Sequence, residues 1–502
     1  MEEYRTWGPP GTGKTTWIAN EAARLAEKYG SDQISICSLT NSAVREAVNR
    51  DIPIDSDNLT TLHARCKRAL QAPSPAEAHM KDFADAYPEY ADFVPLRRDS
   101  GTREEEILAS GSTVFDQIQV ARQRMIPVSK WRPDMQDLYS VWSRWCIESG
   151  LMDYTTWLEV ARDMRALPAQ TVVFVDEAQD HTPLQLATLR SWDTKYLVLV
   201  GDDDQSLYEW SGVVPEEFMK AGIPENHNRV LRQSYRVPSA VHAQAVRILS
   251  RISHRYPKEY LPIFAEGSVI SSNFSLSDAE EAVMPGVDDG QEHMILTSCS
   301  YMLNGIIRNL REAGIPFHNP YRRSNDRWNP LGTEIAIAAR SYLADKWTGK
   351  VILRWMSIMS DDVFSDKKGL ILMCEASLDD AISPEQIRSY LSERTAGSVL
   401  SRRPEAMLKL KDRSVKGLWD YYAKAVGKEV KVIIGTIHSV KSGEMECVHI
   451  FPDMSQAAYT DMLHNPDRIH RLFYVAMTRA RHSVILHDSG NSQYAYPIGR
   501  RS

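Results

Sequence analysis

The sequence predicts an α/β fold with parallel sheets, and three segments carry that prediction. Residues 8–15 match the pattern G-x-x-x-x-G-K-[ST], between an extended segment at 4–7 and a run with apolar residues at helical spacing. Residues 171–175 and 196–200 are apolar runs of strand length, and each is followed by polar residues. Strands of this kind form open sheets that bind ligands at the carboxyl ends of their strands.

The first segment, Gly-Pro-Pro-Gly-Thr-Gly-Lys-Thr, is typical of a phosphate-binding loop. Its glycines let the backbone wrap a phosphate with the N–H groups pointing inward, Lys14 reaches the terminal phosphates, and the Thr15 hydroxyl is placed to bind magnesium. A chance match is the alternative, and the strand and helix flanks argue against it. We expect a nucleoside triphosphate site formed by Gly8, Pro9, Pro10, Gly11, Thr12, Gly13, Lys14, Thr15 and Thr16.

Length and composition set the outer limits. A chain of 502 residues is too long for one core and predicts three or four units at roughly 150 residues each. The composition is that of an ordinary globular protein, no apolar run approaches the ~20 residues of a membrane-spanning helix, and the first residues do not resemble a signal peptide. We therefore expect a protein that stays in the cytoplasm.

The six cysteines show no C-x-x-C pair and no nearby His at ligand spacing, which favours reduced thiols. A net charge of −7 confines any nucleic-acid contact to local surfaces.

The second segment places acids directly after a buried strand: residues 171–180 read Thr-Val-Val-Phe-Val-Asp-Glu-Ala-Gln-Asp. Asp176 can hold magnesium through water, and Glu177 can orient and deprotonate an attacking water. The following Thr182-Pro183-Leu184-Gln185 is a capping box with proline at the first helical position, which predicts a helix behind the acid loop. The alternative is a solvated acidic turn.

The third segment leads from the strand at 196–200 into Gly-Asp-Asp-Asp-Gln-Ser-Leu-Tyr-Glu-Trp at 201–210. Polar groups again follow the strand, and Gln205 could hydrogen-bond a γ-phosphate or its attacking water. Taken alone, a glutamine in an acidic loop is more often a surface residue, so both interpretations stay open.

These segments, together with five others, resemble the ordered motifs of superfamily 1 helicases of the UvrD/Rep type. The five are Thr40-Asn41-Ser42-Ala43, Thr61-Leu62-His63, Leu231-Arg232-Gln233-Ser234-Tyr235-Arg236, Thr436-Ile437-His438-Ser439-Val440-Lys441 and Tyr474-Val475-Ala476-Met477-Thr478-Arg479-Ala480-Arg481. The resemblance implies two RecA-like lobes with parallel sheets, each carrying an inserted, largely helical subdomain. It also implies that ATP and Mg²⁺ bind between the lobes.

For the ATP site, the resemblance implies that Arg236 and Arg479 bring positive charge to the γ-phosphate. Tyr235 would stack on adenine, and Glu444 would contact the ribose. Without the motifs, either arginine would more often form a surface ion pair, Tyr235 would lie in a core and Glu444 would be solvated. The implied catalytic set is Lys14, Asp176, Glu177, Gln205, Arg236 and Arg479, with Thr15 and Asp176 at the metal.

For nucleic acid, the resemblance implies backbone contacts from Asn41, Thr61, His63 and His438, and base stacking on Trp210. Aromatic stacking contributes ~1 to 3 kcal/mol per base without sequence preference. A buried core role is the alternative for Trp210, and a structural role is the alternative for the two histidines.

Several positions depart from the family pattern. Only seven residues precede Gly8, so we expect the adenine-reading glutamine segment to be absent and nucleotide preference to be open. Leu39 replaces a common aromatic residue, and Ser211 replaces a common arginine, which predicts a weaker grip on DNA. Ser442 replaces a glycine, although Gly443 follows it.

The spacing of the motifs predicts the domain plan. The first lobe would comprise residues 1–65 and 166–230 with a helical insertion at 66–165, and the second lobe would comprise 231–325 and 430–502 with an insertion at 326–429. Aromatic residues of the first insertion, Trp131, Tyr139, Trp142, Trp145 and Trp157, are expected to pack in a helical core, and a base-stacking platform is the alternative. A basic loop at 319–329 is either a phosphate contact or a linker.

The predicted function is an ATP-dependent motor on single-stranded DNA that unwinds duplex in replication, repair or recombination, with 3′ to 5′ polarity implied by the family. Expected partners are single-stranded and partly duplex DNA and replication or repair proteins. No membrane contact is expected, and the protein is expected to be a monomer or weak oligomer. The protein would be associated with the nucleoid, or with the host cytoplasm if phage-encoded. The rival is a non-motor switch in which ATP changes affinity for nucleic acid or a protein.

Overall fold

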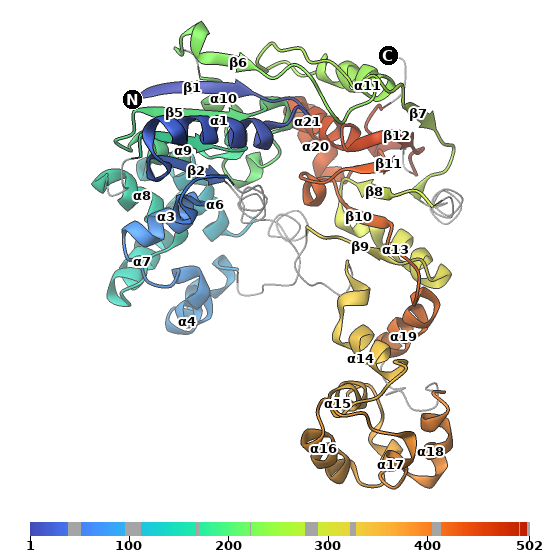
Figure 1. Ribbon diagram of the computed structural model, residues 1–502. Coiled ribbons are helices and arrows are strands. Elements are labelled where there is room, and N and C mark those ends of the chain that lie inside the picture. The colour runs from blue at the N-terminus through green and yellow to red at the C-terminus, as the bar shows by residue number, and fades with distance from the viewer. Residues whose placement is uncertain are drawn as a thin grey trace. The chain divides into compact units, whose positions relative to one another are not determined.

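The computed structural model describes residues 1–38, 52–95, 112–165, 170–220, 222–276, 290–321, 328–403, 413–490 and 492–498. The chain divides into two compact units. Unit 1 comprises residues 1–270, 454–484 and 498–502, and unit 2 comprises 271–453 and 485–497. Two six-stranded sheets with parallel strands organise the chain (Figure 1), so the predicted α/β class is confirmed.

The sheet of unit 1 has the strand order β3-β2-β4-β5-β1-β6, and its neighbouring strands pair in parallel. Its strands are β1 (Glu2–Trp7), β2 (Ile34–Ser38), β3 (Leu59–Thr61), β4 (Val172–Val175), β5 (Tyr196–Gly201) and β6 (Asn228–Val230). The helices of the unit are α1 (Lys14–Tyr29), α3 (Leu62–Ala69), α4 (Met80–Ala86), α6 (Val114–Gln123), α7 (Pro133–Glu148), α8 (Tyr154–Met164), α9 (Pro183–Arg190), α10 (Pro215–Met219), α11 (Ser239–Leu249), α20 (Gln456–His464) and α21 (Pro466–Met477).

Apolar side chains cover both faces of this sheet, which explains the unbroken apolar run of β4. Val173 and Val175 join one hydrophobic cluster, whereas Val172 and Phe174 join the cluster that contains Ile18 of α1. Alternate residues of a strand point to opposite faces, so a strand buried on both faces needs apolar residues at every position. The predicted strands at 171–175 and 196–200 and the predicted capping box at Thr182 are all confirmed.

Helices α4, α6 and α7, which lie between β3 and β4 in the chain, contribute to a separate hydrophobic cluster. This cluster contains Phe83, Phe115, Trp131, Trp142 and Trp145. Tyr139 packs against this cluster, and Trp157 lies in the core beneath the sheet. The prediction that the aromatic residues of this segment pack in a largely helical core is therefore confirmed.

The second sheet has the order β7-β12-β11-β8-β10-β9, and β8 pairs in parallel with both β10 and β11. Its strands are β7 (Ser268–Ser271), β8 (His293–Thr297), β9 (Phe317–His318), β10 (Val432–Thr436), β11 (Met445–Ile450) and β12 (Ala480–Leu486). The helices of unit 2 are α13 (Leu303–Ala313), α14 (Glu334–Tyr342), α15 (Gly349–Met356), α16 (Lys367–Ala376), α17 (Pro384–Arg388), α18 (Glu393–Leu400) and α19 (Arg413–Ala425). Residues 295–297 are part of β8.

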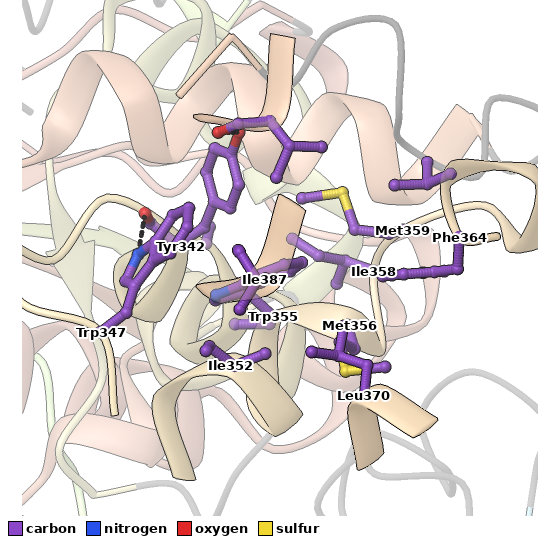
Figure 2. Packing of buried hydrophobic residues seen from close by; sticks show 14 of the residues in the cluster. Tyr342, Trp347, Ile352, Trp355, Met356, Ile358, Met359, Phe364, Leu370 and Ile387 are labelled. Carbon is purple, nitrogen blue, oxygen red and sulfur yellow. Dashed lines mark hydrogen bonds between the residues drawn. The ribbon is translucent and has the colours of Figure 1, made fainter. Parts of the chain in front are cut away.

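Helices α14 to α19 bury a separate core around Tyr342, Trp347 and Trp355 (Figure 2). The Trp347 indole donates a hydrogen bond to the Tyr342 carbonyl oxygen at 3.0 Å, which gives the buried N–H a partner. Among the described residues, no helix is long and apolar enough to cross a membrane.

Three buried imidazoles form a chain in unit 2. His293 Nδ1 lies 3.1 Å from His449 Nε2, and His449 Nδ1 lies 3.0 Å from His487 Nε2. Cys447 Sγ lies 3.9 Å from His449 Nε2. We expected no histidine at ligand spacing from a cysteine, and this expectation is wrong for Cys447. His449 stands two positions later on β11, so both side chains project from the same face of the strand. The six cysteines, all within the described ranges, are buried free thiols.

The three buried imidazoles predict that the protein becomes less stable towards unfolding in acid. Burial lowers the pKa of His487 to about 4, and burial together with the neighbouring imidazoles lowers the pKa of His449 well below its usual value. Between pH 6.5 and 4 an unfolded histidine binds a proton that the folded one does not, so stability falls as pH falls through that window. We expect His487 alone to reduce the free energy of unfolding by about 2 kcal/mol between pH 7.5 and 5.

Urea denaturation followed by tryptophan fluorescence at both pH values measures the effect. His487→Gln should show a smaller loss of stability on acidification than wild type. The exposed His464 provides the matched control, and His464→Gln should behave as wild type. Equal acid losses in all three proteins would contradict the prediction.

Candidate functional site

The phosphate-binding loop lies between β1 and α1. The Gly8 N–H donates to the Gly201 carbonyl oxygen at the end of β5 (2.8 Å), and the Thr12 hydroxyl closes the loop onto the Pro9 carbonyl oxygen (2.8 Å). Lys14 Nζ donates back to the Gly8 carbonyl oxygen at 3.2 Å. The loop is therefore fixed to the sheet at one end and ordered internally by its own residues.

At two positions of the loop the backbone favours glycine, which has no side chain. Gly11 and Gly13 have φ values of 70° and 77°, in the left-handed region that favours glycine. A Cβ on Gly11 would also collide with Cβ of Arg236, whereas Gly13 directly precedes the first turn of α1. The backbone N–H groups at the start of a helix attract anions, so this loop fits a phosphate.

Residues that suit a magnesium ion lie beside the loop. The Thr15 hydroxyl donates to Asp176 Oδ2 at 3.4 Å, and Asp176 follows directly after β4. Hydroxyl and carboxylate oxygens are the donor type that Mg²⁺ prefers. The donor set therefore fits Mg²⁺ held together with a nucleotide.

Glu177 is held in an unusual conformation. Its backbone has φ 50° and ψ 44°, a left-handed geometry that costs a residue other than glycine about 1 kcal/mol or more. Its carboxylate accepts a hydrogen bond from Gln179 Nε2 at 2.6 Å and lies 3.6 Å from Lys14 Nζ. These contacts direct the Glu177 carboxylate towards the lysine of the phosphate loop, and its side chain remains about one-third exposed.

Gln205 connects the loop after β5 to an arginine far away in sequence. Its Nε2 donates to Asp202 Oδ2 at 2.7 Å, and its Oε1 accepts from Arg479 Nη2 at 3.2 Å. Arg479 is only 2% exposed, and its Nε donates to the Val475 carbonyl oxygen at 3.0 Å. Gln205 is thus buried and makes two side-chain hydrogen bonds, which excludes the interpretation of Gln205 as a surface residue.

The segment after β6 packs against the phosphate loop. The Tyr235 N–H donates to the Gly11 carbonyl oxygen (2.8 Å), and the Ser234 hydroxyl donates to the Pro10 carbonyl oxygen (2.8 Å). The same hydroxyl accepts from the Arg236 N–H at 3.3 Å. Tyr235 is 75% exposed, so it is not a core residue, and its ring is open to stack on a flat ligand.

Comparison with known proteins supplies the decisive observation. Residues 5–211 match a model of the AAA domain, and residues 431–487 match a model of the UvrD-like helicase C-terminal domain. The chain belongs to the UvrD/Rep type of superfamily 1 helicases. Seven of the eight motifs lie within the two matched segments, and the motif at 231–236 lies between them.

Individual relatives are distant. DNA helicase II of Escherichia coli is 28% identical over 205 residues, covering 37% of this chain and 28% of the relative. ATP-dependent DNA helicase PcrA of Leuconostoc citreum is 22% identical over 346 residues, covering 62% of this chain and 46% of the relative. PcrA of Staphylococcus aureus Mu50 is 20% identical over 345 residues, covering 62% and 47%. The chain thus spans less than half the length of these relatives.

Three residues assigned to nucleic acid by the helicase motifs lie in unit 1. Thr61 caps α3, where its hydroxyl accepts the Ala64 N–H at 3.3 Å. His63 follows on the same helix, and burial lowers its pKa to about 4, so it is uncharged at neutral pH. Trp210 is half-buried, and its buried indole N–H finds no acceptor among the described residues. The contact of His63 and Trp210 with nucleic acid stays a prediction.

The remaining assigned residues lie elsewhere. Asn41 falls outside the described residues, as do Leu39 and the arginines of the basic loop, Arg322, Arg323 and Arg327. His438 and Glu444 are half-buried residues of unit 2, so their assignment to DNA and ribose stays a prediction.

Sequence reasoning missed several residues that organise the site. Ser234 and Gln179 are parts of recognised motifs, but no role was assigned to either, although Gln179 Oε1 accepts the Asp202 N–H at 3.0 Å. Arg255 and Lys258 belong to no motif quoted above. Three successive aspartates after an apolar strand were the available signal, because buried carboxylates require cations nearby.

Proposed function

We propose that this chain is an ATP-dependent DNA helicase that couples ATP hydrolysis to movement along single-stranded DNA. The observation that carries the proposal is a chain of polar contacts within one unit. It joins Lys14 to Glu177, and Glu177 through Gln179 and Asp202 to Gln205 and the buried Arg479. When bound, MgATP would supply the phosphoryl group and the cation that neutralises it. ATP and Mg²⁺ are the proposed cofactors.

The proposed roles follow from the chemistry of each side chain. Lys14 and the loop N–H groups would bind the phosphates, and Thr15 with Asp176 would hold the metal. Glu177 would accept a proton from the attacking water. Arg236 and Arg479 would stabilise negative charge that develops in the transition state, while Tyr235 would stack on the base and Glu444 would contact the ribose.

Single-stranded DNA is the proposed track. Trp210 would stack on bases, and Asn41, Thr61, His63 and His438 would contact the DNA backbone. Phosphate contacts release counterions, so affinity should fall as salt rises. We propose 3′ to 5′ polarity, duplex unwinding and a place in replication, repair or recombination by analogy with the family.

We also propose the domain plan deduced from the motifs. It is supported by the first sheet, whose strands all fall within 1–230, and by the separate hydrophobic clusters at 76–146 and 336–422. In this plan residues 66–165 and 326–429 are insertions into a first lobe at 1–65 and 166–230 and a second lobe at 231–325 and 430–502.

Two assays test the proposal on the full chain. Steady-state ATP hydrolysis is measured with and without single-stranded DNA over a salt titration, and displacement of streptavidin is measured from oligonucleotides biotinylated at the 3′ or the 5′ end. We expect strong stimulation by DNA that weakens with salt, and faster displacement from the 5′ end, towards which a 3′ to 5′ motor moves.

Each outcome has a distinct meaning. DNA-stimulated hydrolysis without directional displacement would replace the motor with an ATP-dependent switch. Faster displacement from the 3′ end would reverse the proposed polarity. Hydrolysis that is stimulated by RNA and not by DNA would mean that RNA is the track. No hydrolysis under any condition would overturn the proposal.

A further inference from the structure

The loop after β5 concentrates negative charge in the interior. Asp202, Asp203 and Asp204 are each 0% exposed, and each contributes an oxygen to a group whose members lie within 4.8 Å of one another. Removing a carboxylate from water costs several kcal/mol unless cations and hydrogen bonds compensate. The three acids therefore need a built-in positive charge.

Lys258 supplies that charge. Its ammonium nitrogen lies 2.9 Å from Asp202 Oδ1, 2.5 Å from Asp203 Oδ1 and 2.6 Å from Asp204 Oδ2. An ammonium has three N–H groups, so one donor is available for each carboxylate. Burial alone would lower the pKa of Lys258, but the three carboxylates outweigh burial and raise it above its ordinary value. The position that a metal ion could take among these acids is occupied by a permanently charged side chain.

Neighbouring residues complete the arrangement. Arg255 binds Asp204 through two hydrogen bonds of 2.8 and 2.6 Å, and the Tyr256 N–H donates to Asp203 Oδ2 at 2.8 Å. The segment carrying Lys258 is also bonded to α21. Asp467 accepts the N–H groups of Ser253 and His254, both at 2.8 Å. Lys258 thus belongs to a segment fixed both to the aspartate loop and to the helix that precedes Arg479.

Asp202 connects Lys258 to Gln205. One Asp202 oxygen binds Lys258, and the other accepts the Gln205 amide N–H. An ionised carboxylate only accepts hydrogen bonds, and a guanidinium only donates them. The amide of Gln205 must therefore give its NH₂ group to Asp202 and its oxygen to Arg479, because a flipped amide would place donor against donor.

We propose that Lys258 is a positioning residue for ATP hydrolysis, which fixes Asp202 so that Gln205 presents its carbonyl oxygen to Arg479. This inference rests on the proposed ATPase function. Lys258 would touch no reacting atom, and its effect would be transmitted through Asp202 and Gln205.

The main test compares Lys258→Met with the exposed control Lys220→Met in steady-state hydrolysis and in binding of a fluorescent ATP analogue. We expect Lys258→Met to lower kcat about tenfold or more, with KM for ATP and analogue affinity nearly unchanged, since misorientation affects the transition state more than binding. In a Gln205→Ala background, Lys258→Met should cause little further loss. A kcat equal to wild type, or a full additional loss in that background, would overturn the proposal.

Lys258→Met removes the cation that binds the buried carboxylates of Asp202 and Asp203, so a second variant guards against misfolding. Lys258→Met/Asp203→Asn removes one positive and one negative charge and keeps the net charge of the five-residue cluster of Asp202, Asp203, Asp204, Arg255 and Lys258. It should fold as wild type and still show the loss of kcat. A double variant with the kcat of the single variant Asp203→Asn would contradict the positioning role.

A readout that does not need hydrolysis separates this inference from the proposed function. In protein labelled with ¹⁵N-glutamine, the Gln205 side-chain amide signal is assigned by its absence in Gln205→Ala. The signal should move or broaden in Lys258→Met/Asp203→Asn, and should stay in place in Lys220→Met and Asp203→Asn. If wild type hydrolyses no ATP, the proposed function fails while this signal still decides whether Lys258 orders Gln205; an unmoved signal overturns the inference.

Discussion

Glu177→Gln is expected to lower ATP hydrolysis about 10²- to 10⁴-fold while ATP binding is retained. The variant keeps the shape of the side chain and an oxygen that can accept the hydrogen bond from Gln179. It loses the ability to take a proton from water and the attraction to Lys14, whose Nζ lies 3.6 Å away. The loss should therefore appear in kcat and much less in nucleotide affinity.

Single-turnover hydrolysis and equilibrium binding of a fluorescent ATP analogue, both with saturating single-stranded DNA, measure the two quantities. The matched control is Glu27→Gln, an exposed glutamate on α1 that should behave as wild type. Hydrolysis by Glu177→Gln at more than a tenth of the wild-type rate would remove Glu177 from the role of general base.

Arg479→Ala should reduce kcat by about 10³-fold or more, the range over which arginines act at transferring phosphoryl groups. Arg479 is buried, and removing it also leaves the Gln205 carbonyl oxygen without this donor. Arg479→Lys keeps the positive charge but loses the planar fork of donors, so we expect only partial recovery.

The exposed Arg247 on α11 supplies the control, and Arg247→Ala should retain wild-type hydrolysis and stability. Thermal unfolding of each variant checks that loss of rate is not loss of fold. DNA-stimulated hydrolysis by Arg479→Ala at the wild-type level would show that the composite arrangement of Gln205 and Arg479 is not needed for chemistry.

The parts of the site that follow a strand were predictable from sequence. Asp176 and Glu177 stand directly after a run of four buried residues, and a parallel strand buried on both faces leaves an unbroken apolar signature. The phosphate loop was predictable for the same reason, because each of its fixed residues has a local backbone or side-chain task.

Contacts between distant segments were not predictable in this way. Lys258 binds residues more than fifty positions earlier, and nothing in its immediate neighbours, Pro257 and Glu259, marks it as buried. His293, His449 and His487 likewise meet only because β8 and β11 are adjacent and the chain returns beside them. Such pairings depend on sheet order, which local periodicity does not encode.

Two of the bonds that join β1 and the phosphate loop to the segment after β6 run between main-chain groups, and they bear on how this sequence can diverge. Trp7 and Gly11 accept them through carbonyl oxygens, and Leu231 and Tyr235 donate them through N–H groups. A main-chain bond makes little demand on the side chains at its two ends, so residues there can be exchanged over evolutionary time without loosening the loop. Gly11 is the exception, since any side chain would collide with Arg236. Nucleotide-binding geometry that is held in this manner can persist at identities of 20 to 28%, the level at which this chain matches the relatives described above.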